Sequence, residues 1–349
     1  METPVKGLPL PPHFRFEKVD SVWRVPYQLR AREAQSWRRK HEVHPAAADM
    51  CRIGLMVIDV QNTFCHPDFE LFVAGRSGVA AVDDCRRLCE FIYRNLHRIT
   101  RICPTLDTHH PIQIFHSMFL VNHDGDHPEP FTPISNADVQ NGVWSVDPAV
   151  CEQMDLSYDQ ACEYLVHYVE RLKKKEKHEW TIWPYHALLG GIGHALVSAL
   201  EEAIFFHGVT RRSQPLFRLK GSHPLTEHYS AFGPEVTTDH EGNPLAGKDE
   251  SFLRHLLAFD RLIIAGQAKS HCVAWTVEDL LQDPRVRDHG LTENIYLLED
   301  CMSPVVVPGV VDYTETTEAM FQKFSDAGMH RVQSTDPVSS WPEFDASIE

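Results

Sequence analysis

The stretch that decides the fold class is IGLMVID, residues 53–59, a continuous apolar run that ends on an aspartate. Runs of this kind are typical of strands that are covered on both faces. Similar runs recur along the chain: the stretch ending at Leu106, PLFRL (215–219), RLIIA (261–265) and NIYLL (294–298). Helical patterns separate them, and this alternation predicts an α/β protein whose mostly parallel sheet has helices on both faces.

The helical patterns lie in the intervals between the strands. From Val82 to Ile99, apolar residues recur at alternating spacings of three and four, which is one stripe of an amphipathic helix. Further helices are expected at 194–206, 250–258, 273–282 and 314–327. The basic run from Arg30 to Lys40 also has a helical pattern. It is either an anion or partner site or a solvated helix face.

Two segments fall outside this rhythm. Residues 1–50 are predicted to be an N-terminal arm or peripheral helix, and residues 51–349 a single domain. Within that domain, residues 120–180 are predicted to be an insertion. Its turn-rich beginning is typical of loops that serve as lids or binding segments, so we expect a lid or a subunit contact.

The second half of the insertion predicts a helix. The pattern extends from about residue 158 to 176, and Ser157 with Gln160 forms a potential capping box at its start.

Composition excludes several classes of protein. The net charge of −16 argues against binding to nucleic acid, which needs clustered lysine and arginine. The sequence has no apolar run near the roughly 18 residues of a membrane span and no apolar leader core, so neither a membrane partner nor secretion is expected. Nine cysteines without a CxxC pair are typical of a reducing cytosol, which predicts a cytoplasmic protein.

Four polar residues follow predicted strands: Asp59, Asp107, Lys220 and Cys272. Reactive groups of open parallel sheets gather beyond the carboxyl ends of the strands. Cys272 opens a predicted helix, where unpaired N–H groups favour a thiolate and can stabilise an oxyanion. Each residue also has a structural interpretation: a buried thiol, a helix-capping carboxylate or a solvent-exposed ammonium.

Histidines supply a further pattern. Asp107 and His109 are followed by His116 and, much later, His186. Carboxylate and imidazole ligands suit zinc, iron or manganese. The alternative is that histidine-rich turns are unremarkable in a chain with 22 histidines.

Five motifs occur in an order that resembles the nicotinamidase/isochorismatase-like cysteine hydrolases, in particular the nicotinamidase branch. They are LMVIDVQNTFC (55–65), LDTHHP (106–111), IWPYH (182–186), LKGSHPLTEHYSAF (219–232) and IAGQAKSHCVAWTVEDL (264–280). The resemblance extends from about residue 52 to 335. It implies a three-layer αβα sandwich with a Rossmann-like sheet, the isochorismatase-like hydrolase fold.

The resemblance also implies a catalytic triad of Asp59, Lys220 and Cys272. In such a triad the aspartate takes the thiol proton, the sulfur attacks an amide carbonyl, ammonia leaves and water cleaves the thioester. The oxyanion donors would be the backbone N–H groups of Ala268 and Cys272, with a cis peptide between Gln267 and Ala268.

For the nicotinamidase branch, the resemblance implies a divalent ion beside the triad, with zinc as the first choice and iron or manganese as alternatives. Its ligands would be Asp107, His109, His116 and His186. Phe64, Trp183 and Tyr229 match substrate-binding residues, and aromatic stacking on a pyridine ring is physically reasonable. The expected partner is a small-molecule amide, and a homo-oligomer is left open.

Three departures from the family pattern concern the ligands. The gap between His109 and His116 is one residue longer than expected, so three neighbouring histidines compete with His116: His110, His123 and His127. The gap from His116 to His186 is much larger than in compact nicotinamidases. Ala187 replaces the cysteine that usually follows the last histidine, with little expected consequence.

The sequence thus predicts a metal-containing amidohydrolase that converts nicotinamide or a related aromatic carboxamide to the acid and ammonia. Two alternatives stay open at this stage: a metal-free cysteine amidase acting on a small ureido or carbamoyl compound, and a non-catalytic binding protein that has kept the fold. The Asp107-x-His109 pair argues against the first and the complete triad against the second.

Overall fold

A central six-stranded sheet organises the chain, in the strand order β12-β9-β8-β1-β2-β7. The computed structural model describes residues 7–175, 180–288 and 290–344. The strands are β1 (Ile53–Ile58), β2 (Ile99–Asp107), β7 (Arg218–Lys220), β8 (Arg261–Gly266), β9 (Ile295–Leu298) and β12 (His330–Val332). β1 runs parallel to both β2 and β8, and β9 runs parallel to β8 and β12.

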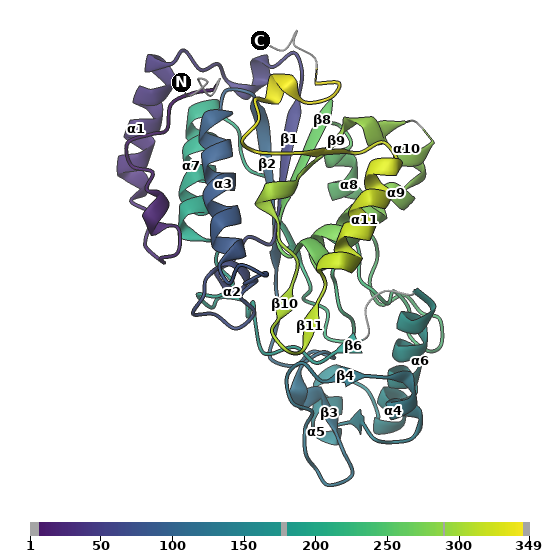
Figure 1. Cartoon of the computed structure of the whole chain (residues 1–349). Helices are drawn as coiled ribbons and strands as arrows, with labels where there is room; N and C mark the ends of the chain where they lie inside the picture. Colours follow the sequence, from purple (N-terminus) through teal and green to yellow (C-terminus); the bar gives the residue numbers. More distant parts are fainter. Residues whose placement is uncertain (1–6, 176–179, 289, 345–349) are drawn as a thin grey trace. The chain divides into compact units, whose positions relative to one another are not determined.

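Helices lie on both faces of this sheet (Figure 1). α3 (Ala80–Arg94) and α7 (Ser198–Arg211) pack side by side on one face, and α9 (Ala274–Gln282) and α11 (Thr314–Asp326) on the other. Shorter helices are α2 (Asn62–Cys65), α8 (Glu250–Leu256) and α10 (Pro284–Arg287), and β10 (Val306–Val307) pairs with β11 (Val311–Asp312). The predicted fold class, a three-layer α/β sandwich with a mostly parallel sheet, is confirmed.

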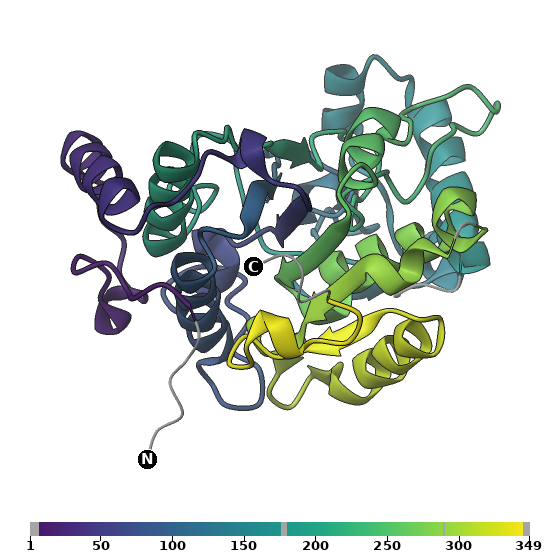
Figure 2. The same ribbon diagram turned by 90° about the horizontal axis from the view of Figure 1, so that it is seen from above.

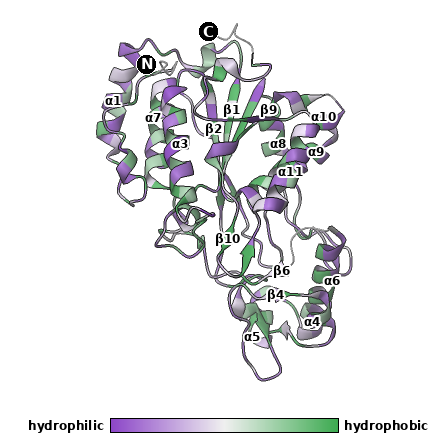
Figure 3. Cartoon of the chain, in the orientation of Figure 1, coloured by the Kyte–Doolittle hydropathy of each residue, from purple (hydrophilic) through white to green (hydrophobic). Residues whose placement is uncertain are grey.

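The core of the sandwich explains why the apolar runs form strands. All six residues of β1 are buried. Leu55 and Val57 belong to one hydrophobic cluster with Leu88 and Ile92 of α3 and Leu200 of α7. The helices carry both hydrophilic and hydrophobic residues along their length (Figure 3), as expected for elements with one buried face. None of the helices in the described part of the chain is long and apolar enough to cross a bilayer.

The N-terminal segment contributes one long helix. α1 (Tyr27–Lys40) packs against α7, on its outer side as seen from above (Figure 2). The predicted helix over the basic run is therefore present.

The chain divides into two units. The first comprises residues 1–106, 195–218 and 250–349, and the second comprises residues 107–194 and 219–249. The second unit holds β3 (Leu120–Val121), β4 (Pro133–Ile134), β5 (Ser145–Val146), β6 (Trp180–Thr181), α4 (Asn136–Gln140), α5 (Pro148–Cys151) and α6 (Tyr158–Lys175). β3 pairs with β5 and β4 with β6, both antiparallel.

The predicted insertion shares a hydrophobic core with the rest of the second unit. Tyr164 and Tyr168 of α6 pack in one cluster with Phe115, Ile182 and Leu225. The capping box of α6 is present: Ser157 N donates to Gln160 Oε1 (3.0 Å) and Gln160 N to Ser157 Oγ (3.2 Å). The boundaries at residue 50 and at 120–180 stay predictions, and positions 1–6 and 176–179 lie outside the described residues.

Some predicted boundaries are wrong. The strand expected at 215–219 is β7, which covers only Arg218–Lys220. Phe217, directly before it, is about half exposed, so the apolar run there is not the buried run that the prediction assumed. The helix expected at 194–206 runs from Ser198 to Arg211. The edge strand β12 was not expected, since three residues are too few for a periodicity.

Candidate functional site

In the first unit, Asp59 directly follows β1 and is fully buried. Its N–H donates to Thr105 Oγ1 (3.1 Å), and the Thr105 hydroxyl donates back to Asp59 Oδ1 (2.5 Å). Thr105 lies on the neighbouring strand β2, so the two contacts fix the carboxylate at the carboxyl end of the sheet. A buried, oriented carboxylate of this kind can accept a proton from a nearby thiol.

Cys272 lies beyond β8 and is buried, with 7% of its surface exposed. After Gly266 the chain forms a π-helical turn, Lys269–Val273, that continues directly into α9. The sequence predicted that the cysteine opens the helix, and the structure places it one turn into this continuous helical segment. The peptide bond between Gln267 and Ala268 is cis, as the resemblance implies.

The pairing of β1 with β8 places both residues at the same edge of the sheet. Ile58 lies opposite Gly266 in the register, and Gln267 N donates to Ile58 O (2.8 Å). Asp59 and the loop that leads to Cys272 therefore leave adjacent strands at the same level. Phe64, in α2, is also part of the first unit and is buried.

Polar side-chain contacts of Gln267 and Lys269 hold the loop before Cys272 in place. Gln267 Nε2 donates to Asp84 Oδ2 (2.8 Å), and Lys269 Nζ pairs with Glu299 Oε1 (2.7 Å). Burial raises the pKa of Asp84, although hydrogen bonds from Ser303 and Gln267 and the charge of Arg87 oppose the shift. These contacts keep the backbone of residues 267–269 in place.

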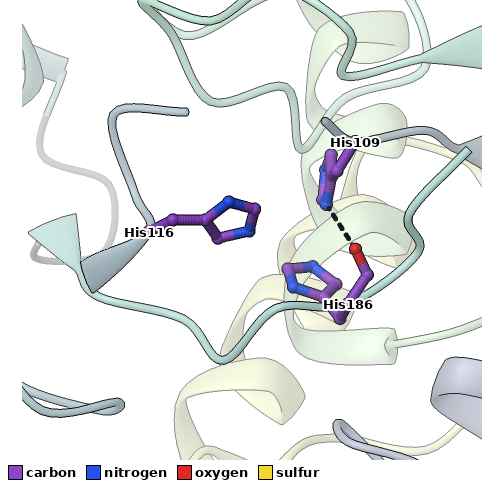
Figure 4. Close-up of side chains that lie close together, drawn as sticks. All are labelled: His109, His116 and His186. Carbon is purple, nitrogen blue, oxygen red and sulfur yellow. Dashed lines mark hydrogen bonds between the residues drawn. The ribbon is translucent and has the colours of Figure 1, made fainter. Parts of the chain in front are cut away.

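In the second unit, His109, His116 and His186 form a buried cluster whose ring nitrogens lie within 4.8 Å of one another (Figure 4). His109 follows β2, His116 precedes a turn, and His186 comes from the segment after β6. Isolated bridges pair His109 with Leu188 and His116 with Trp183, which brings the distant segments together.

Hydrogen bonds fix the orientation of all three rings. Each Nδ1 lies within hydrogen-bond distance of a backbone carbonyl: His109 of His186 O (3.2 Å), His116 of Pro111 O (3.1 Å) and His186 of Pro184 O (2.7 Å). A carbonyl only accepts, so for His116 and His186 the proton lies on Nδ1 and Nε2 is left as an acceptor, the tautomer that binds a metal. His109 also has an acceptor near its Nε2, Asp107 Oδ1 at 3.1 Å, so its contacts suit either tautomer. Burial lowers the pKa of His116 to about 4 and that of His186 well below its usual value, so both are neutral at pH 7.

Asp107 lies beside this cluster. Its Oδ1 is 3.1 Å from His109 Nε2 and its Oδ2 3.8 Å from His186 Nε2. Burial alone would raise the pKa of Asp107, but His109, Lys220 and His186 hold it below its ordinary value. Its carboxylate is therefore charged next to three imidazoles.

Lys220 ends β7 and is buried, with its Nζ 2.9 Å from Asp107 Oδ1 and 2.9 Å from His228 O. Gly221 follows with φ of +89°, and a Cβ there would lie 2.7 Å from Asp107 Oδ1. The lysine-glycine pair of the motif thus lets the backbone pass close to the carboxylate, an approach that a larger residue would block.

The donor set suits a divalent transition-metal ion. His116 Nε2 is buried and has no hydrogen-bond partner in the described part of the chain. A buried polar atom without a partner is costly, and an ion bound to it would remove that cost. Three imidazoles with a carboxylate are a donor set that fits zinc, iron or manganese.

The competing histidines lie elsewhere. His110 is exposed, His123 has 92% of its side chain exposed, and His127 binds Leu120 O (2.6 Å). The cluster contains His116 and none of these three. The gap between His109 and His116 is one residue longer than the family pattern, and within it the Pro111 carbonyl contacts His116 Nδ1 and orients the ring.

The structure adds a residue that the sequence reasoning missed. Glu227 is buried, and its Oε1 accepts hydrogen bonds from Trp183 Nε1 (3.1 Å) and Tyr229 Oη (2.6 Å), while its Oε2 accepts one from Tyr168 Oη (3.1 Å). It therefore joins the two aromatic residues of this unit that were predicted to bind substrate. The only signal in the sequence was an acidic residue inside the TEHYSAF motif.

No model of a known protein family matches the chain, and no curated protein matches it. Solved structures do. The Acinetobacter baumanii nicotinamidase/pyrazinamidase is similar at 20% identity over 82% of this chain and 97% of that chain, with a TM-score of 0.47. The yeast nicotinamidase bound to nicotinaldehyde is similar at 18% identity over 80% and 99%, with a TM-score of 0.49. The Pyrococcus horikoshii pyrazinamidase in complex with zinc is similar at 18% identity over 81% and 99%, with a TM-score of 0.41.

Proposed function

We propose that this protein is a metal-containing cysteine amidohydrolase that converts nicotinamide, or a related aromatic carboxamide, to the corresponding acid and ammonia. The observation that carries the proposal is the buried His109/His116/His186 cluster, because the Nε2 atom of His116 is buried without a hydrogen-bond partner among the described residues and can bind a metal ion. The five ordered motifs, which contain His109, His186 and all three residues of the proposed triad, support the same activity.

In the proposed reaction, Asp59 takes the proton of Cys272 and the thiolate attacks the amide carbonyl. The backbone N–H groups of Ala268 and Cys272 stabilise the oxyanion, and Lys220 contributes positive charge. Ammonia leaves with a proton, a water molecule cleaves the thioester, and the acid is released. Phe64, Trp183 and Tyr229 contact the aromatic ring.

A bound zinc, iron or manganese ion would supply a Lewis acid for the ring nitrogen of the substrate. Asp107, His109, His116 and His186 would hold it. Zinc is our first choice.

The thiol mechanism is tested by ammonia release from nicotinamide, pyrazinamide and a simple ureido compound. Cys272→Ala should lose activity by at least about 10³-fold, because the variant lacks the thiolate that forms the proposed thioester. Cys162→Ala, at a half-buried thiol on α6, is the matched control and should keep wild-type rates. A Cys272→Ala protein that releases ammonia at the wild-type rate would refute the mechanism.

The metal is tested on the same samples. The purified protein should contain about one transition-metal ion per chain, and His116→Ala should lose it. Treatment with a strong chelator should abolish activity, and zinc, iron or manganese should restore it. Full activity without bound metal would favour the ureido or carbamoyl amidase instead.

The proposal also includes a cytoplasmic location and a role for the insertion at residues 120–180. The nine cysteines are all thiols, which is consistent with a reducing compartment. We expect the 120–180 segment to influence substrate range or assembly, which substrate profiles and light scattering of surface variants in that segment would measure.

A further inference from the structure

A cavity of about 390 Å³ lies in the first unit, where residues 13–30 of the N-terminal segment pack against α7. It is lined by His13, Phe14, Arg15, Lys18, Ser21, Trp23, Arg24, Pro26, Arg30 and Glu202. None of these residues has a part in the proposed amide hydrolysis. The cavity is large enough for a small organic molecule, for which sites commonly measure about 300–1,000 Å³.

The walls of this cavity are fixed by specific contacts. Trp23 N donates to Ser198 Oγ (2.9 Å), and the Ser198 hydroxyl donates to Trp23 O (3.0 Å). Arg30 Nε pairs with the buried Glu202 Oε1 at 2.6 Å, and Phe14 packs against Tyr93 with ring centroids 5.2 Å apart. These contacts join the N-terminal segment to α7, so the cavity between them is part of the folded structure.

The charge of the lining is unusual for this protein. Four cations line the cavity against one carboxylate, Glu202, so the lining carries a net charge of +3 in a chain whose total charge is −16. Arg30 and Glu202 neutralise each other. The other three cations make no ion pair with any described residue.

Nearby acidic groups do not cancel this charge. Glu33 binds Arg30 (2.8 Å) and lies 3.3 Å from His13 Nδ1, and Asp20 lies 3.6 Å from Arg86, outside the lining. Burial and the neighbouring arginines lower the pKa of His13 to about 4, so it is neutral at pH 7. The uncompensated charge is therefore that of Arg15, Lys18 and Arg24, which line the cavity and are exposed to solvent.

We propose that this cavity is a binding site for a small molecule that carries a phosphate group. Arg15, Lys18 and Arg24 contact the phosphate oxygens, and Trp23 and Phe14 contact the organic part. A phosphate monoester carries about −1.5 to −2 charges at pH 7, whereas a carboxylate carries one. Three cations therefore match the charge of a phosphate better than that of a carboxylate. The cations belong to the N-terminal segment, and Glu202 on the opposite side belongs to α7. A bound ligand would therefore stabilise the packing of that segment against α7.

The test uses calorimetric titration and thermal unfolding of the full-length protein with inorganic phosphate, adenosine 5′-monophosphate and adenosine. The triple variant Arg15→Gln/Lys18→Gln/Arg24→Gln removes the three cations. We expect the monophosphate to bind and raise the Tm of the wild type, and the triple variant to bind it at least 100-fold more weakly, since each charge-assisted contact is worth about tenfold. Adenosine should not bind. Phosphate binding without any preference for the monophosphate would identify free phosphate as the ligand source and would also support the site.

A matched control separates the site from the overall charge. The variant Arg32→Gln/Lys173→Gln/Lys174→Gln removes three exposed cations outside the cavity and changes the net charge equally. It should bind as the wild type does. Equal weakening in both triple variants, or no phosphate-dependent binding to the wild type, would overturn the proposal. Neither readout depends on amide hydrolysis, so it stands apart from the proposed function.

Discussion

The buried carboxylate of Glu227 makes a measurable contribution to stability that depends on pH. Burial, together with the neighbouring Glu235, raises the pKa of Glu227 to about 7, although the hydrogen bonds from Tyr229, Trp183 and Tyr168 oppose the shift. In the unfolded chain a glutamate titrates near 4.3–4.5. Between these two values the folded protein holds a proton that the unfolded chain has lost.

The sign of the effect follows from proton binding. Stability from this group is fully present below about pH 4.5, decreases as the pH rises and is lost above about pH 7, because the folded state must then bury a charged carboxylate. Each pKa unit corresponds to about 1.36 kcal/mol, so the whole loss is about 3 kcal/mol, of which about 2.5 kcal/mol falls between pH 5 and pH 8.

Glu227→Gln keeps the shape of the side chain and removes the titration. We expect the free energy of unfolding of the wild type, relative to the variant, to fall by about 2.5 kcal/mol from pH 5 to pH 8, measured by urea denaturation at each pH. The other titrating groups contribute equally to the unfolding free energies of both proteins, so their contributions cancel in the difference. Glu170→Gln, at an exposed position of α6 on the same unit, is the control and should give a constant difference. A Glu227→Gln difference that is equally constant would refute the reasoning.

Three further substitutions test the fold. Gly266→Ala should destabilise the protein by at least about 3 kcal/mol in urea denaturation, because φ is +127° and a Cβ would lie 2.1 Å from Ile58 O; a loss below 1 kcal/mol would contradict this close approach. Arg211→Gln should lower the free energy of unfolding by about 3–5 kcal/mol, because the buried guanidinium binds the Asp49 carboxylate and the His44 and Ile99 carbonyls. The control Arg212→Gln, at an exposed position, should leave it nearly unchanged. Equal effects of the two substitutions would contradict the assigned contacts. Ser157→Ala should cost about 1 kcal/mol through loss of the α6 cap, and an unchanged Tm would show that the cap contributes nothing.

Local pattern was enough to predict the layered fold. The continuous apolar run of 53–58 matches β1 residue for residue, because a strand covered on both faces needs only apolar side chains and no partner-specific signal. The capping box of Ser157 and Gln160 was equally readable, since both residues lie within one turn. Elements that depend on distant neighbours, such as the short strand β12, were not readable in this way.

For the candidate site, the sequence by itself determined which residue types were available and which of them follow strands: Asp59, Asp107, Lys220 and Cys272. It left His116 in competition with three neighbours, because spacing along the chain does not tell which ring faces inward. Only the tertiary structure decided that question, since the segments carrying His116 and His186 meet through a bridge between residues 67 positions apart, His116 and Trp183. The tertiary structure alone also revealed Glu227, because the donors that hold its carboxylate come from α6, from the IWPYH motif and from its own loop. Contacts between segments far apart in sequence depend on packing, which no local pattern encodes.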